Sequence, residues 1–242
     1  MRVRVPRRSR AYFAAISPGF ALATLLATTG AGAADPPPAR TTTPADPVRI
    51  DLGLHLGGVY RAGDAPAFPI TDRGGVSFGV SAFVAPSRRF SFGLAFEHAG
   101  LGGEKAEGDL GSLTITRDLS LLWAGLRVHL ISTDAVRIGI LIGPGLAWQG
   151  VDASGLITPG IGALPSTYAC SGGDSANLAL RAGLGARFML GSGFSFLVDA
   201  SLDNVRLASE VIGDCAPGAG TVSLIGARVG FGYELDVTSF VR

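Results

Sequence analysis

His98, Asp174 and Ser175 have the types that nucleophilic catalysis combines: a base, an acid that orients the base, and a hydroxyl nucleophile. Asp174 and Ser175 belong to the segment GGDS, whose composition is typical of a turn. Ser175 is not part of a nucleophile elbow, and no spacing in the chain indicates that Ser175 and His98 meet. We therefore expect no catalytic site at these residues.

Two glycine-rich stretches have some likeness to phosphate-binding loops: GPG at 143–145 and GLGAR at 183–187. Neither ends in the Lys-Ser or Lys-Thr pair of a phosphate loop, and no helical pattern follows either of them. Glycine at these places favours strand coiling and barrel curvature instead. We expect no cofactor.

Charged residues provide a larger set of chemically capable groups, and they share one parity along the chain. Because arginine pairs bidentately with carboxylates and an unpaired buried charge is costly, a matched set of this kind fits a crowded polar interior. The set contains five arginines, five carboxylates and two histidines: Arg127, Arg137, Arg181, Arg187, Arg228, Asp51, Glu97, Asp199, Asp203, Glu234, His55 and His129. We interpret it as a structural network, and an ion-conducting lumen is the alternative.

The two cysteines, Cys170 and Cys215, lie in two long polar connections, 150–176 and 205–220. An even number of cysteines in an exported chain favours a disulfide, which would tie these two connections together. No histidine or second cysteine pair accompanies them, so we expect no metal site.

The elements that must position these groups are strands, because the chain from Val48 onward alternates in polarity and shows no helical period. Three connections are tight, at 86–89, 132–135 and 191–193. The four other connections are long: 62–74, 99–113, 150–176 and 205–220. The eight predicted strands are approximately 48–61, 75–85, 90–98, 114–131, 135–149, 177–190, 194–204 and 221–237.

Each predicted strand carries an uncharged apolar face opposite the charged one. The segment ARVGFGYEL at 227–235 shows the pattern, with Ala227, Val229, Phe231, Tyr233 and Leu235 on one face. The charged face is rich in glycine, and the only lysine, Lys105, lies in a predicted loop. This pattern favours an apolar face that contacts lipid; a soluble exported barrel with the apolar face inside is the alternative.

Aromatic residues on the apolar face gather near the strand ends. At lipid–water interfaces such residues form two girdles. The expected members are Phe90, Phe188, Phe194, Phe231 and Tyr233 near the end with tight turns, and Tyr60, Phe78, Phe96 and Trp148 near the end with long loops.

The N-terminal segment 1–33 has the basic, apolar and small-residue regions of a cleaved signal peptide, and 34–47 is a Pro- and Thr-rich tail. Of the 20 basic residues, cleavage removes five arginines, which leaves 15 against 19 acidic residues. This balance gives no indication of a nucleic-acid partner.

In pattern, rather than in any residue motif, the chain resembles the small eight-stranded outer-membrane barrels of the OmpA/OmpX type over 48–242. The resemblance implies an all-β, eight-stranded antiparallel up-and-down transmembrane barrel in a Gram-negative outer membrane, monomeric and surrounded by lipid. One departure concerns the C-terminus, because Phe240 lies off the parity of Phe231 and Tyr233 and two residues before the end.

From the sequence as a whole we expect a non-catalytic role, either structural or in surface interaction through the four long loops, with an extracellular ligand or partner that the sequence does not identify. Two alternatives remain open. One is a narrow ion- or solute-conducting pore, and the other is a lipid A-modifying enzyme that would use His98, Asp174 and Ser175 near the outer rim.

Overall fold

The computed structural model describes residues 47–63, 69–109, 111–158, 160 and 164–237. The predicted signal peptide, nearly all of the predicted tail and Phe240 lie outside these residues. The regular elements within them are β-strands: β1 (Arg49–Gly63), β2 (Ile70–Asp72), β3 (Gly74–Ala85), β4 (Phe90–Gly108), β5 (Gly111–Ser132), β6 (Val136–Ile157), β7 (Ser166–Gly173), β8 (Asn177–Gly191), β9 (Phe194–Arg206), β10 (Val211–Ile212), β11 (Ala216–Pro217) and β12 (Thr221–Asp236).

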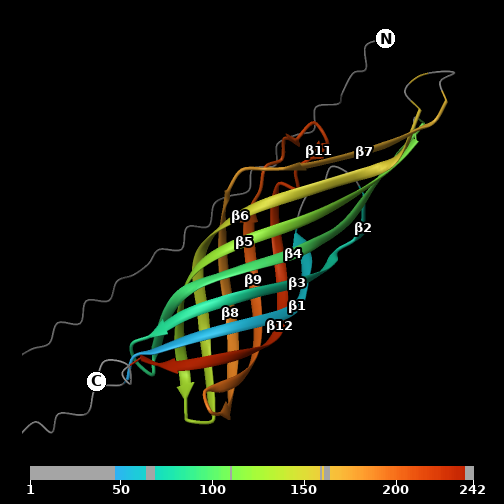
Figure 1. The fold of residues 1–242 in the computed structure, drawn as a ribbon. Coiled ribbons are helices and arrows are strands. Elements are labelled where there is room, and N and C mark those ends of the chain that lie inside the picture. Colours follow the sequence, from blue (N-terminus) through green and yellow to red (C-terminus); the bar gives the residue numbers. More distant parts are fainter. Residues whose placement is uncertain (1–46, 64–68, 110, 159, 161–163, 238–242) are drawn as a thin grey trace, which may run out of the picture. The chain divides into compact units, whose positions relative to one another are not determined.

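Eight of the strands form a closed ring in chain order (Figure 1). Each strand pairs antiparallel with the next through β1, β3, β4, β5, β6, β8, β9 and β12, and β12 pairs with β1 to close the ring. Closure gives every wall strand a partner on both sides, so the wall itself has no free edge. The predicted eight-stranded antiparallel up-and-down barrel is therefore confirmed.

The three tight turns lie where the sequence predicts them, between β3 and β4, β5 and β6, and β8 and β9. The end of the barrel that carries them is called the turn end here, and the opposite end the distal end. The prediction of long loops at 99–113, 150–176 and 205–220 was wrong in large part. β4 and β5 form one hairpin through 99–113, β6 continues to Ile157 and pairs with β7, and 205–220 contains the β10–β11 hairpin.

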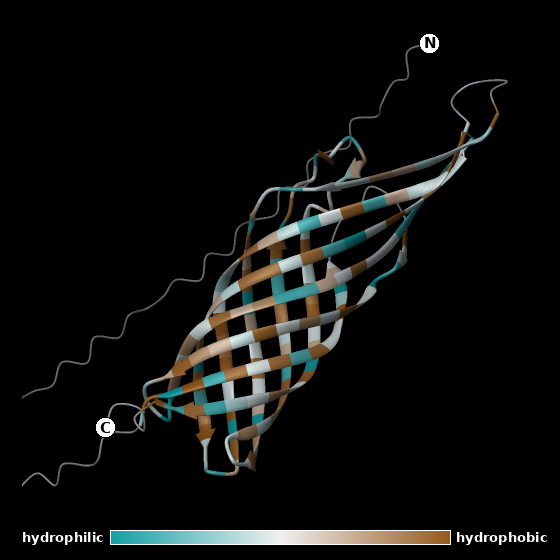
Figure 2. Cartoon of the chain, viewed as in Figure 1, coloured by the Kyte–Doolittle hydropathy of each residue, from teal (hydrophilic) through white to brown (hydrophobic). Residues whose placement is uncertain are grey.

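The outer surface of the barrel carries a continuous apolar band. Leu54 on β1 and Phe231 on β12 are each 64% exposed, and brown segments alternate with pale ones along the wall strands (Figure 2). The outward apolar run covers at least nine residues on each of four strands, and includes 52–60, 76–84, 194–202 and 225–233. A tilted strand of about 9–11 residues crosses the hydrocarbon core of a bilayer. The apolar band therefore has the height that a transmembrane barrel requires.

At the distal end the polarity of the two faces reverses. Beyond His98, Ser120 and Trp148, the strands β4, β5 and β6 continue with polar residues outside, and β7 and β2 pair with β6 and β4. We call this projecting part of the structure the distal sheet (Figure 1). Among the described residues, no helix has the length and apolarity to cross a membrane.

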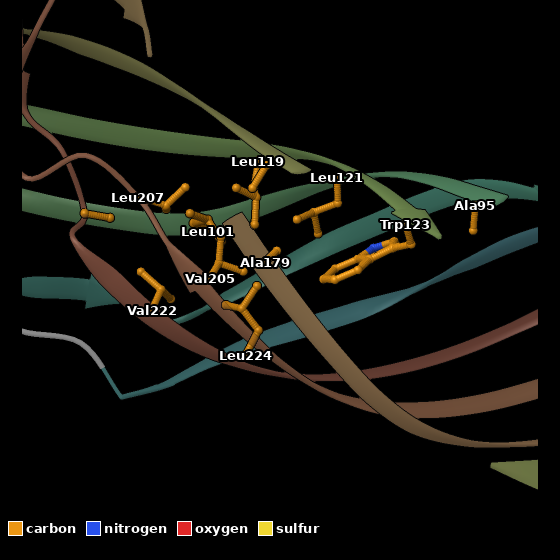
Figure 3. Packing of buried hydrophobic residues seen from close by; sticks show 12 residues of the cluster. Ala95, Leu101, Leu119, Leu121, Trp123, Ala179, Val205, Leu207, Val222 and Leu224 are labelled. Atoms are coloured by element: carbon orange, nitrogen blue, oxygen red, sulfur yellow. The ribbon is translucent and has the colours of Figure 1, made fainter. Parts of the chain in front are cut away.

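The interior is not uniformly polar, which corrects the expectation of an inner face built from glycine and charges. Side chains from β4, β5, β8, β9 and β12 point into one space toward the distal end (Figure 3). These buried residues, called the apolar plug here, are Ala95, Leu101, Leu119, Leu121, Trp123, Ala147, Ala179, Val205, Leu207, Ala219, Val222 and Leu224. Ion pairs fill the interior toward the turn end.

Candidate functional site

The central ion-pair cluster consists of Glu97, Arg181, Asp203 and Arg228, all of them predicted interior residues. Arg181 donates two hydrogen bonds of 2.7 Å to the carboxylate of Asp203 and one of 2.6 Å to Glu97 Oε2. Arg228 donates from Nε to Glu97 Oε1 at 2.7 Å. Glu97 is fully buried. Each of its two carboxylate oxygens accepts a hydrogen bond from a different guanidinium within the barrel. Such charge-assisted bonds offset the cost of removing four ionised groups from water.

A second group of ion pairs lies closer to the turn end. Glu234 accepts hydrogen bonds from Arg49 at 3.2 Å and from Arg137. Arg187 Nη1 lies 2.6 Å from Asp51 Oδ1. Arg49 was missing from the predicted set because it stands at the first position of its strand, where alternation is hardest to read. The structure thus distributes the predicted charges over two levels of the barrel.

Four predicted interior residues belong to neither group of ion pairs, and three of them line a small cavity that also contacts the central cluster. The Arg127 guanidinium stacks over the Phe83 ring, with its central carbon 4.5 Å from the ring centroid. His129 Nε2 lies 3.5 Å from Ser91 Oγ. Arg127, Asp199 and His55 line a cavity of about 40 Å³. This volume accommodates water and excludes a larger solute.

The apolar plug closes the interior on the distal side of the ion pairs. Trp123 is 3% exposed. The central carbon of the Arg181 guanidinium lies over its ring, 4.4 Å from the ring centroid. Leu119, Leu121 and Leu224 are almost completely buried on the distal side of Trp123. An ion would have to leave the polar cluster and cross this apolar layer to pass through the barrel.

A third polar group, beyond the plug, was not predicted from the sequence. Glu104 is fully buried and accepts two hydrogen bonds from Arg117, at 3.1 and 3.0 Å, and further ones from Arg61. Glu104 lies in the predicted loop 99–113, which obscured its burial, and a bulge at Gly100–Gly103 shifts its parity. Within the bulge Gly102 has φ +81°, and a Cβ there would clash with the carbonyl oxygen of Asp72. A sequence signal did exist at Arg117, which shares the inward parity of Trp123 on β5.

The distal sheet is covered on its inner face by residues 207–220, which include the β10–β11 hairpin and are called the cap here. Cys170 on β7 and Cys215 in the cap form a disulfide with a Cα–Cα distance of 5.6 Å. A buried apolar cluster lies beside it, formed by Ile115, Val151, Ala153, Ile212 and Ala216. The disulfide and this cluster fix the cap against the sheet.

Asp174, considered above as a catalytic acid, holds the distal connections together. Its carboxylate accepts hydrogen bonds from the backbone N–H of Gln149 at 2.7 Å, from the Asn177 side chain at 2.7 Å and from the backbone N–H of Ala208 at 3.4 Å. It therefore joins β6, the start of β8 and the cap. Ser175 is exposed beside it.

The structure does not bring His98 and Ser175 together. His98 Nδ1 lies 3.1 Å from Ser120 Oγ on the neighbouring strand, and the imidazole lies beside the Phe78 ring at an interplanar angle of 45°, with ring centroids 5.3 Å apart. β5 and β6 lie between His98 and the segment that contains Ser175. Since adjacent strands are about 4.8 Å apart, these two side chains are too distant to share a proton.

The aromatic residues predicted for the girdles lie on the outward parity of their strands. At the turn end, Phe194 and Tyr233 have ring centroids 4.9 Å apart, and Phe196 contacts both Phe231 and Phe188. At the distal side of the apolar band, Trp148 is half-buried opposite Ser120, while Tyr60 on β1 is exposed. Their role as interfacial girdles remains a prediction.

No family model matches the sequence, and no curated protein matches it. Several solved structures resemble the fold. Ail, the attachment invasion locus protein of Yersinia pestis, is 16% identical, with 78% of this chain and 97% of that chain covered and a TM-score of 0.39. A major outer membrane protein from Thermus thermophilus is 11% identical (77% and 99% covered, TM-score 0.44), and the Escherichia coli outer membrane protease OmpT is 10% identical (81% and 99%, TM-score 0.39). These likenesses concern the fold alone.

Proposed function

We propose that the protein is a monomeric outer-membrane barrel, exported through the signal peptide at 1–33, that acts without catalysis by presenting the distal sheet outside the cell. The observation that carries this proposal is the reversal of polarity along single strands. The outward parity is apolar at the height of a bilayer and polar in the distal sheet. Water therefore surrounds the distal sheet, and the disulfide keeps its cap in place.

A conducting role receives little support from the interior. The ion-pair clusters leave a cavity of about 40 Å³, and the apolar plug lies between that cavity and the distal end. A barrel of eight strands has an interior that side chains fill. The charges therefore serve to stabilise the interior rather than to line a path.

An enzymatic role receives little support from the distal rim. Within the described residues no hydrogen bond joins the Ser175 hydroxyl to a basic side chain, and Asp174 is occupied by three structural hydrogen bonds. Ser120 does contact His98, but it occupies a ladder position that is paired on both sides, with His98 and with Trp148. Its neighbouring backbone N–H groups are therefore engaged in the sheet and do not form an oxyanion hole.

Fractionation of expressing cells, followed by gels of heated and unheated samples, tests the barrel. We expect the protein in the outer-membrane fraction, with migration that changes on heating. Recovery as a soluble periplasmic protein would contradict the proposal.

Two further measurements test the role. Planar bilayers that contain the purified protein should show no single-channel steps, and lipid A mass profiles should be the same with and without expression. Discrete conductance steps would favour the pore, and a new or lost lipid A species would favour the enzyme.

A further inference from the structure

On the outer face of the distal sheet, one row across four strands is almost free of side chains. The register pairs Gly100 with Asp118, Asp118 with Gly150, and Gly150 with Gly173. Three of the four positions are glycine, so backbone forms the floor and Asp118 is the one side chain on this row. We call the row the glycine trough.

Two rows of larger side chains border the trough. On the side of the apolar band stand His98, Ser120 and Trp148, which are paired across β4, β5 and β6. On the far side stand Thr116, Asp152 and Ser171 on β5, β6 and β7. Each border row lies two residues from the trough, which is about 7 Å along the strands. The Cα atoms of the two border rows are therefore about 13 Å apart.

Three polar side chains around the trough have no partner within the described part of the chain, whereas His98 and Ser120 contact each other at 3.1 Å. Among the described residues, no hydrogen bond or ion pair involves the side chain of Asp118, Asp152 or Trp148. The Asp118 carboxylate lies over the backbone of Gly150, where a Cβ would be 2.5 Å from Asp118 Oδ1. A larger residue at position 150 would displace this carboxylate, so the glycine keeps Asp118 in the trough.

The chemistry around the trough fits a neutral sugar. Carboxylates accept hydrogen bonds from sugar hydroxyls, serine and threonine hydroxyls both donate and accept, and an indole offers an apolar face beside an N–H donor. A sulfated or phosphorylated sugar fits poorly, because Asp118 and Asp152 repel anions and no lysine or arginine stands on these three rows.

An apolar groove lies on the lipid-facing surface of the same strands. It has a volume of about 660 Å³ and is lined on β4, β5 and β6 by Phe92, Leu94, Ala124, Ile142 and Pro144, with Leu180 of β8 beside them. Ala124 has the smallest outward side chain among the residues that line the groove. The groove therefore offers space for acyl chains below a polar site at the edge of the band.

We propose that the glycine trough and this groove together bind a glycolipid, with its neutral sugar in the trough and its acyl chains in the groove. The proposal rests on the membrane position given under the proposed function. Both sites lie on β4, β5 and β6, which favours a membrane lipid over a free sugar as the occupant. Two rows separate the sites, that of His98, Ser120 and Trp148 at the edge of the apolar band and that of Phe96, Leu122 and Leu146 within it, and the linkage between sugar and acyl chains would cross them.

The chain holds two tryptophans, one inside the plug and one at the trough, which allows a direct test. Trp123→Phe leaves Trp148 as the sole indole. This variant is placed in phosphatidylcholine nanodiscs with and without digalactosyl diacylglycerol, and Trp148 emission is titrated against the glycolipid fraction. Asp118→Ala should weaken the response about tenfold, the equivalent of one lost charge-assisted hydrogen bond. Ser112→Ala, at the far end of the same face, should leave it unchanged.

Further arms separate the other occupants. Ala124→Phe, which fills the groove, should also weaken the response. An equal response to phosphatidylglycerol, an unchanged response in Asp118→Ala, or binding of free galactobiose that Ala124→Phe leaves intact would each overturn the proposal. Heat-dependent gel migration of the same samples reports barrel assembly: an unassembled protein contradicts the proposed function, whereas an assembled barrel without a glycolipid response contradicts this inference alone.

Discussion

The two halves of β5 have the same backbone conformation and opposite surfaces. Toward the turn end its outward residues are Leu122, Ala124, Leu126, Val128 and Leu130, and Arg127 faces inward. Toward the distal end its outward residues are Ser112, Thr114, Thr116, Asp118 and Ser120, and Ile115 and Leu119 face inward. The pairing with β6 continues in register across this boundary, from Gly111 to Trp123. The surrounding solvent, rather than the strand, therefore decides which face is apolar.

The largest difference in the free energy of unfolding should appear between alanine variants of two buried carboxylates. Each carboxylate binds two arginines, and Glu97 lies inside the apolar band whereas Glu104 lies beyond it. Glu97→Ala leaves Arg181 and Arg228 without this partner, and we expect a loss of about 3–5 kcal/mol in the free energy of unfolding. Glu104→Ala should cost less, because water can reach Arg117 at the distal end once side chains rearrange. Urea titration of the folded barrel in lipid vesicles measures both, and equal losses would mean that depth in the barrel does not matter.

The same substitution on the two halves of β5 should give the next largest difference. Leu126→Arg places a charge in lipid and should destabilise the barrel by about 2–4 kcal/mol. Thr114→Arg, on the same face of the distal half, should change stability by less than about 0.5 kcal/mol. The fraction of barrel that resists urea in vesicles gives both values. A comparable loss in Thr114→Arg would place that half of the strand in lipid as well.

Alanine substitutions at Asp174 and at its neighbour Ser175 should differ by a smaller and local effect, in the hydrogen exchange of nearby backbone amides. Asp174→Ala removes an acceptor of three hydrogen bonds, and bonds to a charged group contribute about 1.5–3 kcal/mol each. Hydrogen exchange should therefore accelerate at the backbone amides of Gln149 and Ala208, while the barrel wall stays protected. Ser175→Ala should leave exchange and lipid A profiles unchanged, and a changed lipid profile would restore the enzymatic interpretation.

The smallest effect should come from the aromatic contacts at the turn end. Phe231→Leu removes an edge-on contact with Phe196, whose ring centroid lies 5.8 Å away, and should cost about 0.5–1.5 kcal/mol. Phe92→Leu is the matched control, because Phe92 also faces outward on its strand and makes no ring contact with a described residue. Equal losses in vesicle unfolding would indicate that lipid contact, and not ring pairing, accounts for the aromatic cluster.

The wall of the barrel was predictable because its strands alternate without interruption, and the tight turns fix the register. The distal end was less predictable for a physical reason. Once the outer solvent changes from lipid to water, an outward polar residue no longer distinguishes a strand from a loop, so 99–113 appeared to be a loop. The bulge at Gly100–Gly103 also shifts the parity of Glu104 and hides its burial.

The interior charges were identified from parity, but their pairing was not. Glu97 contacts Arg181 and Arg228, which are 84 and 131 residues away in the chain, and alternation carries no information on such partners. The apolar plug was missed because Leu119, Leu121 and Trp123 share the inward parity with Arg127. Along one strand, the inward residues change from charged to apolar close to the point where the outward residues change from apolar to polar. A search of the sequence for this double change would have found the plug.

The seam between β1 and β12 joins strands from the two ends of the barrel sequence, with partners from Arg49–Asp236 to Gly63–Ser223. Until β12 arrives, β1 and β9 each present a row of bare amide and carbonyl groups, and in hydrocarbon each such group costs several kcal/mol. A partly assembled sheet is therefore unstable in lipid. Entry into the membrane and the pairing of β12 with β1 become one event, and such long-range closure is slow.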